Sequence, residues 1–258
     1  MRRWTAAEMQ AWARRASSVP VQMLERTGST SAWLKENPPD APTLAIAWAQ
    51  TAGYGQQGRV WRMRPGQDLA FSLFMPRSGP VPPALTPWLA FHLREQLQRW
   101  TAAPLWHKWP NDLYVPAGKV SGTLVERVRD GLIIGTGINW WGEPAQGAGL
   151  GASAPPWAFL DEWVSWLLEA VPAFTTAAWQ KVLPRWSDHD RFAPRQPVRL
   201  SDGREAVYLG PDGEGRLQLW LDGRLERLSS GGLSVVEPAG QPGGQLRPQG
   251  EDDQHQQL

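Results

Sequence analysis

The segment GYGQQGRVW, from Gly53 to Trp61, raises the first chemical question, because Gly53, Gly55 and Gly58 follow the spacing G-x-G-x-x-G. This spacing is found in dinucleotide-binding turns and in the loop that covers the phosphates in kinases. A dinucleotide turn requires a helix after its third glycine, whereas the residues after Gly58 lack helical apolar spacing and include Pro65. A kinase requires V-A-I-K, H-R-D and D-F-G segments, none of which occurs in the sequence. By itself, the glycine spacing is therefore typical of a surface turn.

Side chains that can bind a ligand occur in four other segments. Lys119 follows a glycine, so its ammonium group can reach an anion, although a lysine in a hairpin is usually only a solvated charge. Asn111, Asp112 and Asn139 lie in apolar strands and need partners, of which a ligand or Mg²⁺ is one. Ser29 or Ser31 can equally cap a helix. The four segments are Gly28-Ser29-Thr30-Ser31, Lys108-Trp-Pro-Asn-Asp112, Gly118-Lys119-Val-Ser-Gly122 and Gly135-Thr-Gly-Ile-Asn139.

Taken in order, these segments resemble the motifs of the biotin protein ligases. That family has a D-S-T-N segment, the loop Q-x-x-G-R-G-R-x-G-R-x-W, K-W-P-N-D, G-K-x-x-G and G-x-G-I-N, and it ends in an SH3-like barrel. The chain matches them from Gly28 to Asn139, with Gln50 at the start of the loop and Trp61 at its end. The K-W-P-N-D and G-I-N matches are specific, and Leu228-Ser-Ser-Gly231 is similar to the family's last barrel strand.

The resemblance implies a two-step reaction, in which biotin and ATP form biotinyl-adenylate and a lysine of a biotin carboxyl carrier protein then accepts the biotin. The resemblance implies that Lys119 is the catalytic residue, because it can contact both the biotin carboxylate and the α-phosphate. Mg²⁺ is expected with ATP, and Asp112 is its candidate ligand. The implied biotin-binding residues are Ser29, Thr30, Ser31, Gln50, Tyr54, Gly55, Gln56 and Lys119. Those implied for ATP and the adenylate are Gly53, Gly58, Arg59, Trp61, Asn111, Asp112 and Asn139.

The sequence departs from the family in the glycine loop, where Tyr54 and Gln56 replace two arginines and only Arg59 remains. The arginines hold the biotin carboxylate and the phosphate in the family, and each charge-assisted contact is worth roughly 1.5–3 kcal/mol. Three interpretations follow: an active ligase that holds its adenylate loosely, a non-catalytic binding relative, or a ligase for another acyl acid such as lipoate or octanoate. Retained Lys119 favours catalysis.

The elements that must position these residues are predicted from apolar periodicity. Thr5-Ala-Ala-Glu8 is a capping box that opens a helix. Strands are predicted at 19–24, 44–50, 69–75, 120–128 and 132–140, with a hairpin around Arg129-Asp130-Gly131. Helices are predicted at 32–36, 84–100, 157–170 and 175–186. Clustered strands without strict βαβ alternation indicate an α+β fold with a mixed or antiparallel sheet.

From about Arg191 the sequence changes to short strands separated by turns. Strands are expected at 197–200, 206–209, 217–220, 224–228 and 233–236, with Asp202-Gly203, Asp212-Gly213 and Asp222-Gly223 as turn pairs. We therefore expect a catalytic domain at 1–190 and a small SH3-like barrel at 191–238. Residues 239–258 are rich in Gly, Pro, Gln and charge and are expected to form a disordered tail.

Composition excludes several classes of protein. The formal net charge is +1, which gives no electrostatic case for a nucleic-acid or membrane-surface protein. The sequence has no cysteine, and its four histidines lack metal-ligand spacing, so a zinc site built by the protein is not expected. No apolar run reaches membrane-spanning length, and one short helix before the first motif leaves no room for a DNA-binding domain. We expect a cytoplasmic protein that binds no DNA; the oligomeric state stays open, a homodimer included.

Overall fold

The computed structural model describes residues 3–16, 18–142, 147–231 and 233–235. Its larger sheet has seven strands in the order β1-β2-β3-β7-β6-β5-β4. Strands β1 (Val21–Thr27) and β2 (Thr43–Gln50) are parallel, whereas all the other neighbours are antiparallel. The remaining strands are β3 (Leu69–Pro76), β4 (Trp106–Lys108), β5 (Asp112–Val115), β6 (Gly118–Val128) and β7 (Gly131–Ile138). The predicted mixed α+β fold is confirmed. The sequence reading missed β4 and β5, which have only three and four residues.

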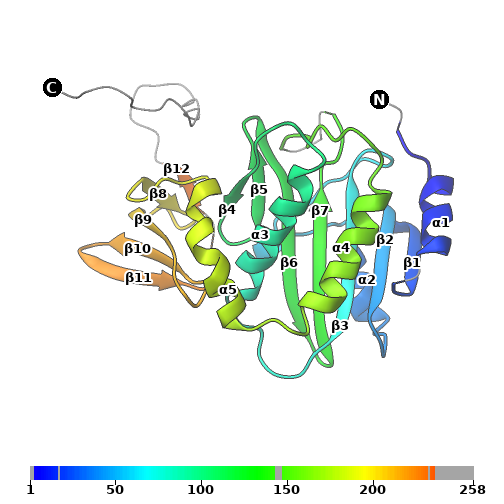
Figure 1. Cartoon of the computed structure of the whole chain (residues 1–258), viewed down its shortest axis with the longest axis horizontal. Coiled ribbons are helices and arrows are strands. Elements are labelled where there is room, and N and C mark those ends of the chain that lie inside the picture. The colour runs from blue at the N-terminus through cyan, green and yellow to red at the C-terminus, as the bar shows by residue number, and fades with distance from the viewer. Residues whose placement is uncertain (1–2, 17, 143–146, 232, 236–258) are drawn as a thin grey trace.

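The helices divide between the two faces of this sheet. Helices α3 (Leu85–Gln98) and α4 (Trp157–Ala170) lie in front of it in Figure 1, whereas α2 (Thr30–Glu36) lies behind. Helix α1 (Ala6–Arg15) packs beside β1 and begins at the predicted capping box, with Thr5 and Glu8 bonding each other's backbone amides. The helix predicted at 175–186 is shorter: α5 (Thr176–Val182) is followed by the 3₁₀ turns η2 (Leu183–Arg185) and η3 (Ser187–His189). Pro184, at the start of η2, cannot continue the α-helical hydrogen bonds.

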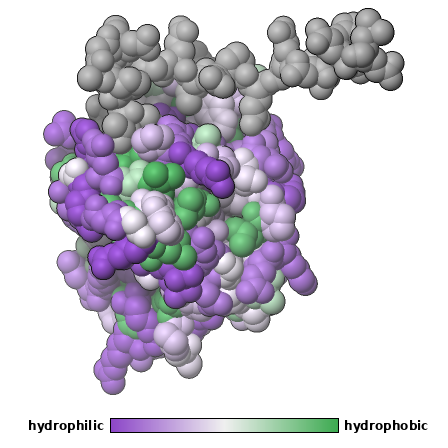
Figure 2. Space-filling view, turned by 90° about the vertical axis from the view of Figure 1, so that its left-hand side faces the viewer, coloured by the Kyte–Doolittle hydropathy of each residue, from purple (hydrophilic) through white to green (hydrophobic). Residues whose placement is uncertain are grey.

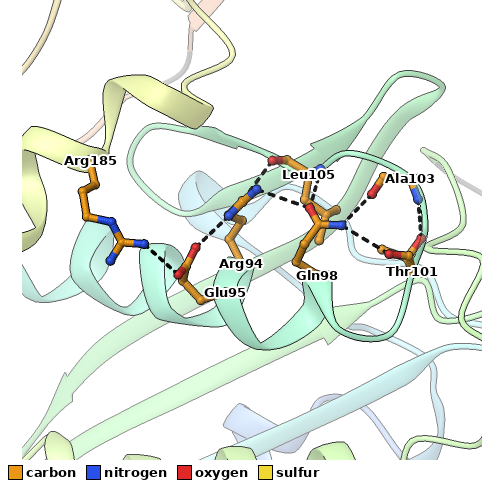
Figure 3. A network of polar contacts seen from close by, with 7 residues as sticks. All are labelled: Arg94, Glu95, Gln98, Thr101, Ala103, Leu105 and Arg185. Carbon is orange, nitrogen blue, oxygen red and sulfur yellow. Dashed lines mark hydrogen bonds and ion pairs between the residues drawn. The ribbon is translucent and has the colours of Figure 1, made fainter. Parts of the chain in front are cut away.

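A polar network fixes the connection from α3 to β4 (Figure 3). Gln98 donates to the carbonyl oxygens of Thr101 (3.2 Å) and Ala103 (3.0 Å) and accepts from the Leu105 amide (3.1 Å). Buried Arg94 donates to the Leu105 carbonyl (3.1 Å) and to Glu95 (2.7 Å). Buried polar groups need such partners, and here they hold the residues that lead into β4.

The second sheet has five antiparallel strands in the order β11-β10-β9-β8-β12. Among the described residues no ladder joins its edge strands β11 and β12, so the sheet is open and closure into an SH3-like barrel stays a prediction. Asp222 and Gly223 both have positive φ (49° and 77°), as a tight hairpin turn between β10 and β11 requires. The five strands are β8 (Pro197–Leu200), β9 (Glu205–Pro211), β10 (Leu217–Leu221), β11 (Arg224–Leu228) and β12 (Leu233–Val235).

The outer face of the second sheet carries exposed apolar side chains. Trp220 (49% exposed) and Leu225 (38%) are cross-strand partners. Figure 2 views the molecule from the side of this sheet and shows apolar surface bordered by hydrophilic residues. The expected tail at 239–258 lies outside the described residues. No helix in the described part of the chain is long and apolar enough to cross a membrane.

Candidate active site

A cavity of about 320 Å³ lies on the face of the larger sheet opposite α3 and α4. The position of the cavity follows from the way successive residues of β7 point to opposite faces of the sheet. Ile134 and Ile138 point into the main core, whereas Gly135 and Gly137 point to the other face. A Cβ at Gly135 would lie 2.7 Å from Ser31 Oγ, and one at Gly137 would lie 2.3 Å from the Trp61 ring. The two glycines of the G-x-G-I-N motif therefore leave room for side chains that form the cavity.

The structure brings together most of the residues that the sequence singled out. Gly53 and Gly58 do not line the cavity; they lie in the hairpin that covers it. The predicted residues that do line it are Ser29, Thr30, Ser31, Gln50, Tyr54, Gly55, Gln56, Arg59, Trp61, Asn111, Asp112, Lys119 and Asn139.

One wall of the cavity is a chain of hydroxyl groups. Ser72, which is fully buried in β3, lies 2.7 Å from Thr30 Oγ1 and 2.8 Å from Ser31 Oγ. Gln50 Oε1 accepts from the Thr30 amide at 2.8 Å. Ser29 occupies the N-cap position of α2 but makes no side-chain capping bond, so its hydroxyl is not used in that way. The wall offers both donors and acceptors to a polar head group.

The glycine loop is a small β-hairpin. Tyr54 and Val60 form an antiparallel bridge, and the turn contains Gln57 (φ 56°) and Gly58 (φ 70°). The amide of Gly55 donates to the Arg59 carbonyl at 2.8 Å. That amide therefore serves the hairpin and is not free to bind a ligand. The third glycine is explained by the turn, since residues with a side chain seldom adopt positive φ.

Tyr54 ties this hairpin to the rest of the protein. Its hydroxyl donates to Glu126 Oε2 (3.1 Å) and accepts from Lys35 Nζ (3.0 Å), and Lys35 Nζ lies 2.6 Å from Glu126 Oε1. Desolvation opposes the charge on Lys35, but the bonds to Glu126 and Tyr54 outweigh it and raise the pKa of Lys35. The three side chains form a closed set, which we call the Tyr54 latch. No sequence pattern indicates this latch, because Lys35 and Glu126 belong to no motif.

Lys119 is held at the centre of the site. Its Nζ lies 2.6 Å from Asp112 Oδ1 and 5.9 Å from the centre of the Trp61 ring. A Cβ at Gly122 would lie 3.1 Å from Lys119 Nζ and 3.2 Å from Asp112 Oδ1, so the second glycine of G-K-x-x-G makes room for this ion pair. An ammonium group in this position can meet a carboxylate and a phosphate together.

Asn111 and Asn139 are both buried, and both find partners in the protein backbone. Asn111 Nδ2 donates to the Thr123 carbonyl at 2.8 Å. Asn139 Nδ2 donates to the carbonyl oxygens of Ala148 (3.1 Å) and Lys119 (3.3 Å). The two amides therefore hold the strand that carries Lys119, in addition to lining the cavity.

The sequence interpretation assigned no role to several residues that line or approach the cavity. Lys108 is the first residue of K-W-P-N-D, and burial lowers its pKa to about 8; Lys119, Arg191 and Arg59 add to the shift and Asp112 opposes it. Burial and Asp112 raise the pKa of Tyr114 to about 12. Arg191, from the connection to β8, packs 4.2 Å from the centre of the Tyr114 ring. No local pattern could have placed Arg191 beside β5.

Comparison with known proteins shows which proteins this chain is similar to. The model of the biotin/lipoate A/B protein ligase family matches residues 23–140. Over this part the chain is similar to the biotin protein ligases, as the order of its motifs implied.

Two relatives and one solved structure show the extent of the similarity. The biotin--[acetyl-CoA-carboxylase] ligase of Paracoccus denitrificans is 34% identical over 52% of this chain and 60% of its own length. The bifunctional ligase/repressor BirA of Escherichia coli is 29% identical over 74% of this chain and 65% of its own length. The chain thus spans less than two thirds of each. The biotin protein ligase of Aquifex aeolicus, solved with biotin and ATP, shares the fold with a TM-score of 0.69, 24% identity, and coverage of 83% of this chain and 97% of that one.

Proposed function

We propose that the protein activates biotin with ATP to form biotinyl-adenylate and transfers the biotin to a lysine of a biotin carboxyl carrier protein. The observation that carries this proposal is the position of Lys119, beside Asp112 and the Trp61 ring in one cavity. The names of the relatives support the same activity.

In the first step a carboxylate oxygen of biotin attacks the α-phosphorus of ATP. A new P–O bond forms, the bond from the α-phosphorus to the bridging oxygen breaks, and pyrophosphate leaves. Lys119 would contact the carboxylate and the α-phosphate, whose mutual repulsion it reduces. The Trp61 indole would stack on the adenine, and the wall of Thr30, Ser31 and Gln50 would bind the ureido group.

In the second step the neutral amine of the carrier lysine attacks the acyl carbon of the mixed anhydride. An amide bond forms, AMP leaves, and the amine loses a proton. The mixed anhydride is already activated toward an amine. The second step therefore requires that the carrier lysine reach the acyl carbon, and it needs no additional catalytic group.

Mg²⁺ would enter this site with ATP. Among the described residues no three acidic or histidine side chains form a metal cluster, but Asp112 is a single carboxylate facing the cavity. That suits Mg²⁺, which keeps most of its waters and is usually bound by one or two carboxylates together with substrate phosphates.

Pyrophosphate exchange tests the proposal directly. The protein is incubated with ATP, labelled pyrophosphate and either biotin, lipoate or octanoate, and label is followed into ATP. We expect exchange with biotin only. Exchange with lipoate or octanoate would instead identify a ligase for another acyl acid, and biotin binding without exchange would identify a non-catalytic relative.

A further inference from the structure

The hydroxyl wall of the cavity contains a serine to which the sequence interpretation assigned no role. Ser72 lies in β3 and is fully buried. Its Oγ lies 2.7 Å from Thr30 Oγ1 and 2.8 Å from Ser31 Oγ. A Cβ at Gly135, the partner of Ser72 in β7, would lie 3.4 Å from Ser72 Oγ and 2.7 Å from Ser31 Oγ. The absence of a side chain at Gly135 therefore leaves room for both serine hydroxyls.

One end of this chain of hydroxyls has a fixed direction of donation. The backbone amide of Thr30 can only donate, and it lies 2.8 Å from Gln50 Oε1, so the oxygen of the Gln50 side chain must face Thr30. The same oxygen lies 3.3 Å from Thr30 Oγ1 and can only accept, so the Thr30 hydroxyl is the donor in that contact. This leaves Gln50 Nε2 as the donor end of the wall.

The direction of the other hydrogen bonds follows, because each hydroxyl carries one proton. When Thr30 donates to Gln50, it accepts from Ser72. The Ser72 proton is then used, so Ser72 accepts from Ser31. This direction makes three hydrogen bonds, whereas the opposite one makes two, because Gln50 Oε1 cannot donate. The proton of Ser31 is therefore used inside the wall, and Ser31 presents only lone pairs to the cavity.

We propose that Ser72 is a positioning residue, which acts through Ser31 and makes the wall select a head group that carries N–H donors. This inference rests on the proposed function and refines its substrate class. The cyclic urea of biotin has N–H groups that can donate to Ser31 and a carbonyl oxygen that can accept from Gln50 Nε2. The dithiolane ring of lipoate has no such donor and would leave the lone pairs of Ser31 without a partner.

The experiment compares biotin with its two cyclic carbamate analogues, in which an oxygen atom replaces one ureido N–H group or the other. The replacement keeps the shape of the ring but turns a donor into an acceptor. Calorimetric titration of the full chain with each compound gives the ratio of the carbamate Kd to the biotin Kd. An oxygen that faces Ser31 can be accepted only if the direction of the wall reverses, which removes the bond from Thr30 to Gln50.

Ser72→Ala frees the Ser31 hydroxyl to turn either its proton or its lone pairs toward the ligand. We expect this variant to reduce the larger of the two Kd ratios by about 3- to 10-fold, the range of one neutral hydrogen bond. In a Ser31→Ala background the acceptor is absent, so adding Ser72→Ala should change the ratio by less than about twofold. Ser72→Thr keeps a hydroxyl group and should keep the native ratio.

Ser121→Ala is the matched control. Ser121 is a buried serine of β6 that donates to the Gly137 carbonyl at 2.8 Å and does not line the cavity, so its loss should leave the Kd ratios unchanged. If Ser72→Ala does not fold, Ser72→Cys takes its place with the same expected direction, because a thiol is a weak donor and a weak acceptor.

Two results would overturn the role of Ser72. Ser72→Ala could weaken biotin and both carbamates by the same factor, as expected of a serine that only supports the fold, or it could leave all three affinities unchanged. The proposed activity is judged separately. Biotin binding without pyrophosphate exchange would overturn the activity, whereas the Kd ratios would still decide the role of Ser72. A native protein that binds none of the three compounds would overturn both.

Discussion

At the scale of single residues, Lys119 is the side chain on which adenylate formation should depend most. We expect Lys119→Ala to slow single-turnover adenylation by roughly 100-fold, since one preorganised donor at a developing charge is worth about that factor. Lys181→Ala is the matched control, because Lys181 is exposed on α5. An unchanged single-turnover rate in Lys119→Ala would remove this lysine from the mechanism.

Lys108 gives the site a predictable pH dependence. Burial lowers the pKa of Lys108 to about 8, so in the empty protein it loses its charge as the pH rises above that value. Bound phosphates favour the charged amine, so binding above pH 8 must also take up a proton and should weaken by up to about tenfold per pH unit. The measurement is the Kd for ATP from pH 6.5 to 9.5.

The control for this pH dependence is Lys108→Arg, which keeps its charge throughout the range. Its Kd for ATP should stay nearly constant where that of the native protein rises. Parallel profiles for the two proteins would show that another group titrates.

At the scale of elements, the Tyr54 latch should control how long the hairpin stays over the cavity. Tyr54→Phe removes the hydroxyl that bonds Glu126 and Lys35, and Glu126→Gln removes the charge that pairs with Lys35. Each change should speed release of preformed adenylate by about 3- to 30-fold, from the loss of one or two partly exposed contacts. Amide hydrogen exchange at 54–60 should increase in parallel.

Glu36→Gln is the control for the latch, because Glu36 is an exposed carboxylate at the end of α2, next to Lys35. Native release rates in both latch variants would mean that other contacts hold the hairpin. Replacing Tyr54 by arginine would add a charge to the loop but would also break the latch, because it removes the hydroxyl that bonds Glu126 and Lys35.

At the scale of the whole molecule, the two sheets share one core at the proposed border between domains 1–190 and 191–238. Trp109 Nε1 donates to the Gly215 carbonyl (2.9 Å), and Trp179 Nε1 donates to that of Asp212 (2.8 Å). Buried Asp190 accepts from Trp186 Nε1 (2.8 Å) and from the Tyr208 hydroxyl on β9. We therefore expect a single cooperative unfolding transition.

Asp190 should make this junction sensitive to pH. Burial raises the pKa of Asp190 from 3.8 to about 6, although the hydrogen bonds from Tyr208, Phe192 and Trp186 oppose the shift. The folded state therefore holds the proton more tightly, and the resulting stabilisation is complete below pH 3.8 and lost as the pH rises through about 6. Relative to Asp190→Asn, which does not titrate, the native free energy of unfolding should fall by roughly 2–3 kcal/mol between pH 3.5 and 7.

Urea unfolding at several pH values measures this change, with exposed Asp188→Asn as the control. A constant difference between the native protein and Asp190→Asn would show that Asp190 is ionised throughout this range.

The sequence by itself determined the elements with strong periodicity and the motifs by which the chain resembles the biotin protein ligases. The capping box at Thr5 and the Asp222-Gly223 turn act through local backbone geometry, which a short stretch of sequence records. The glycines of G-x-G-I-N were found from the motif alone, although their role, leaving room for Ser31 and Trp61, is a matter of tertiary packing. The motifs likewise predicted many of the residues that line the cavity, but not Lys108 or Tyr114. Short β4 and β5 escaped prediction because three or four residues carry too little periodicity to reveal a strand.

Only the tertiary structure decided which side chains meet across the site. The Tyr54 latch joins residues from α2, the hairpin and β6, and the Tyr114 ring contacts both Lys108 and Arg191, which lies 83 positions later in the sequence. Neither set has a sequence signature, because Coulombic and hydrogen-bonding contacts depend on distance in space and not on separation along the chain. The same tertiary packing raises the pKa of Asp190 and lowers that of Lys108, since burial is a property of the folded molecule alone.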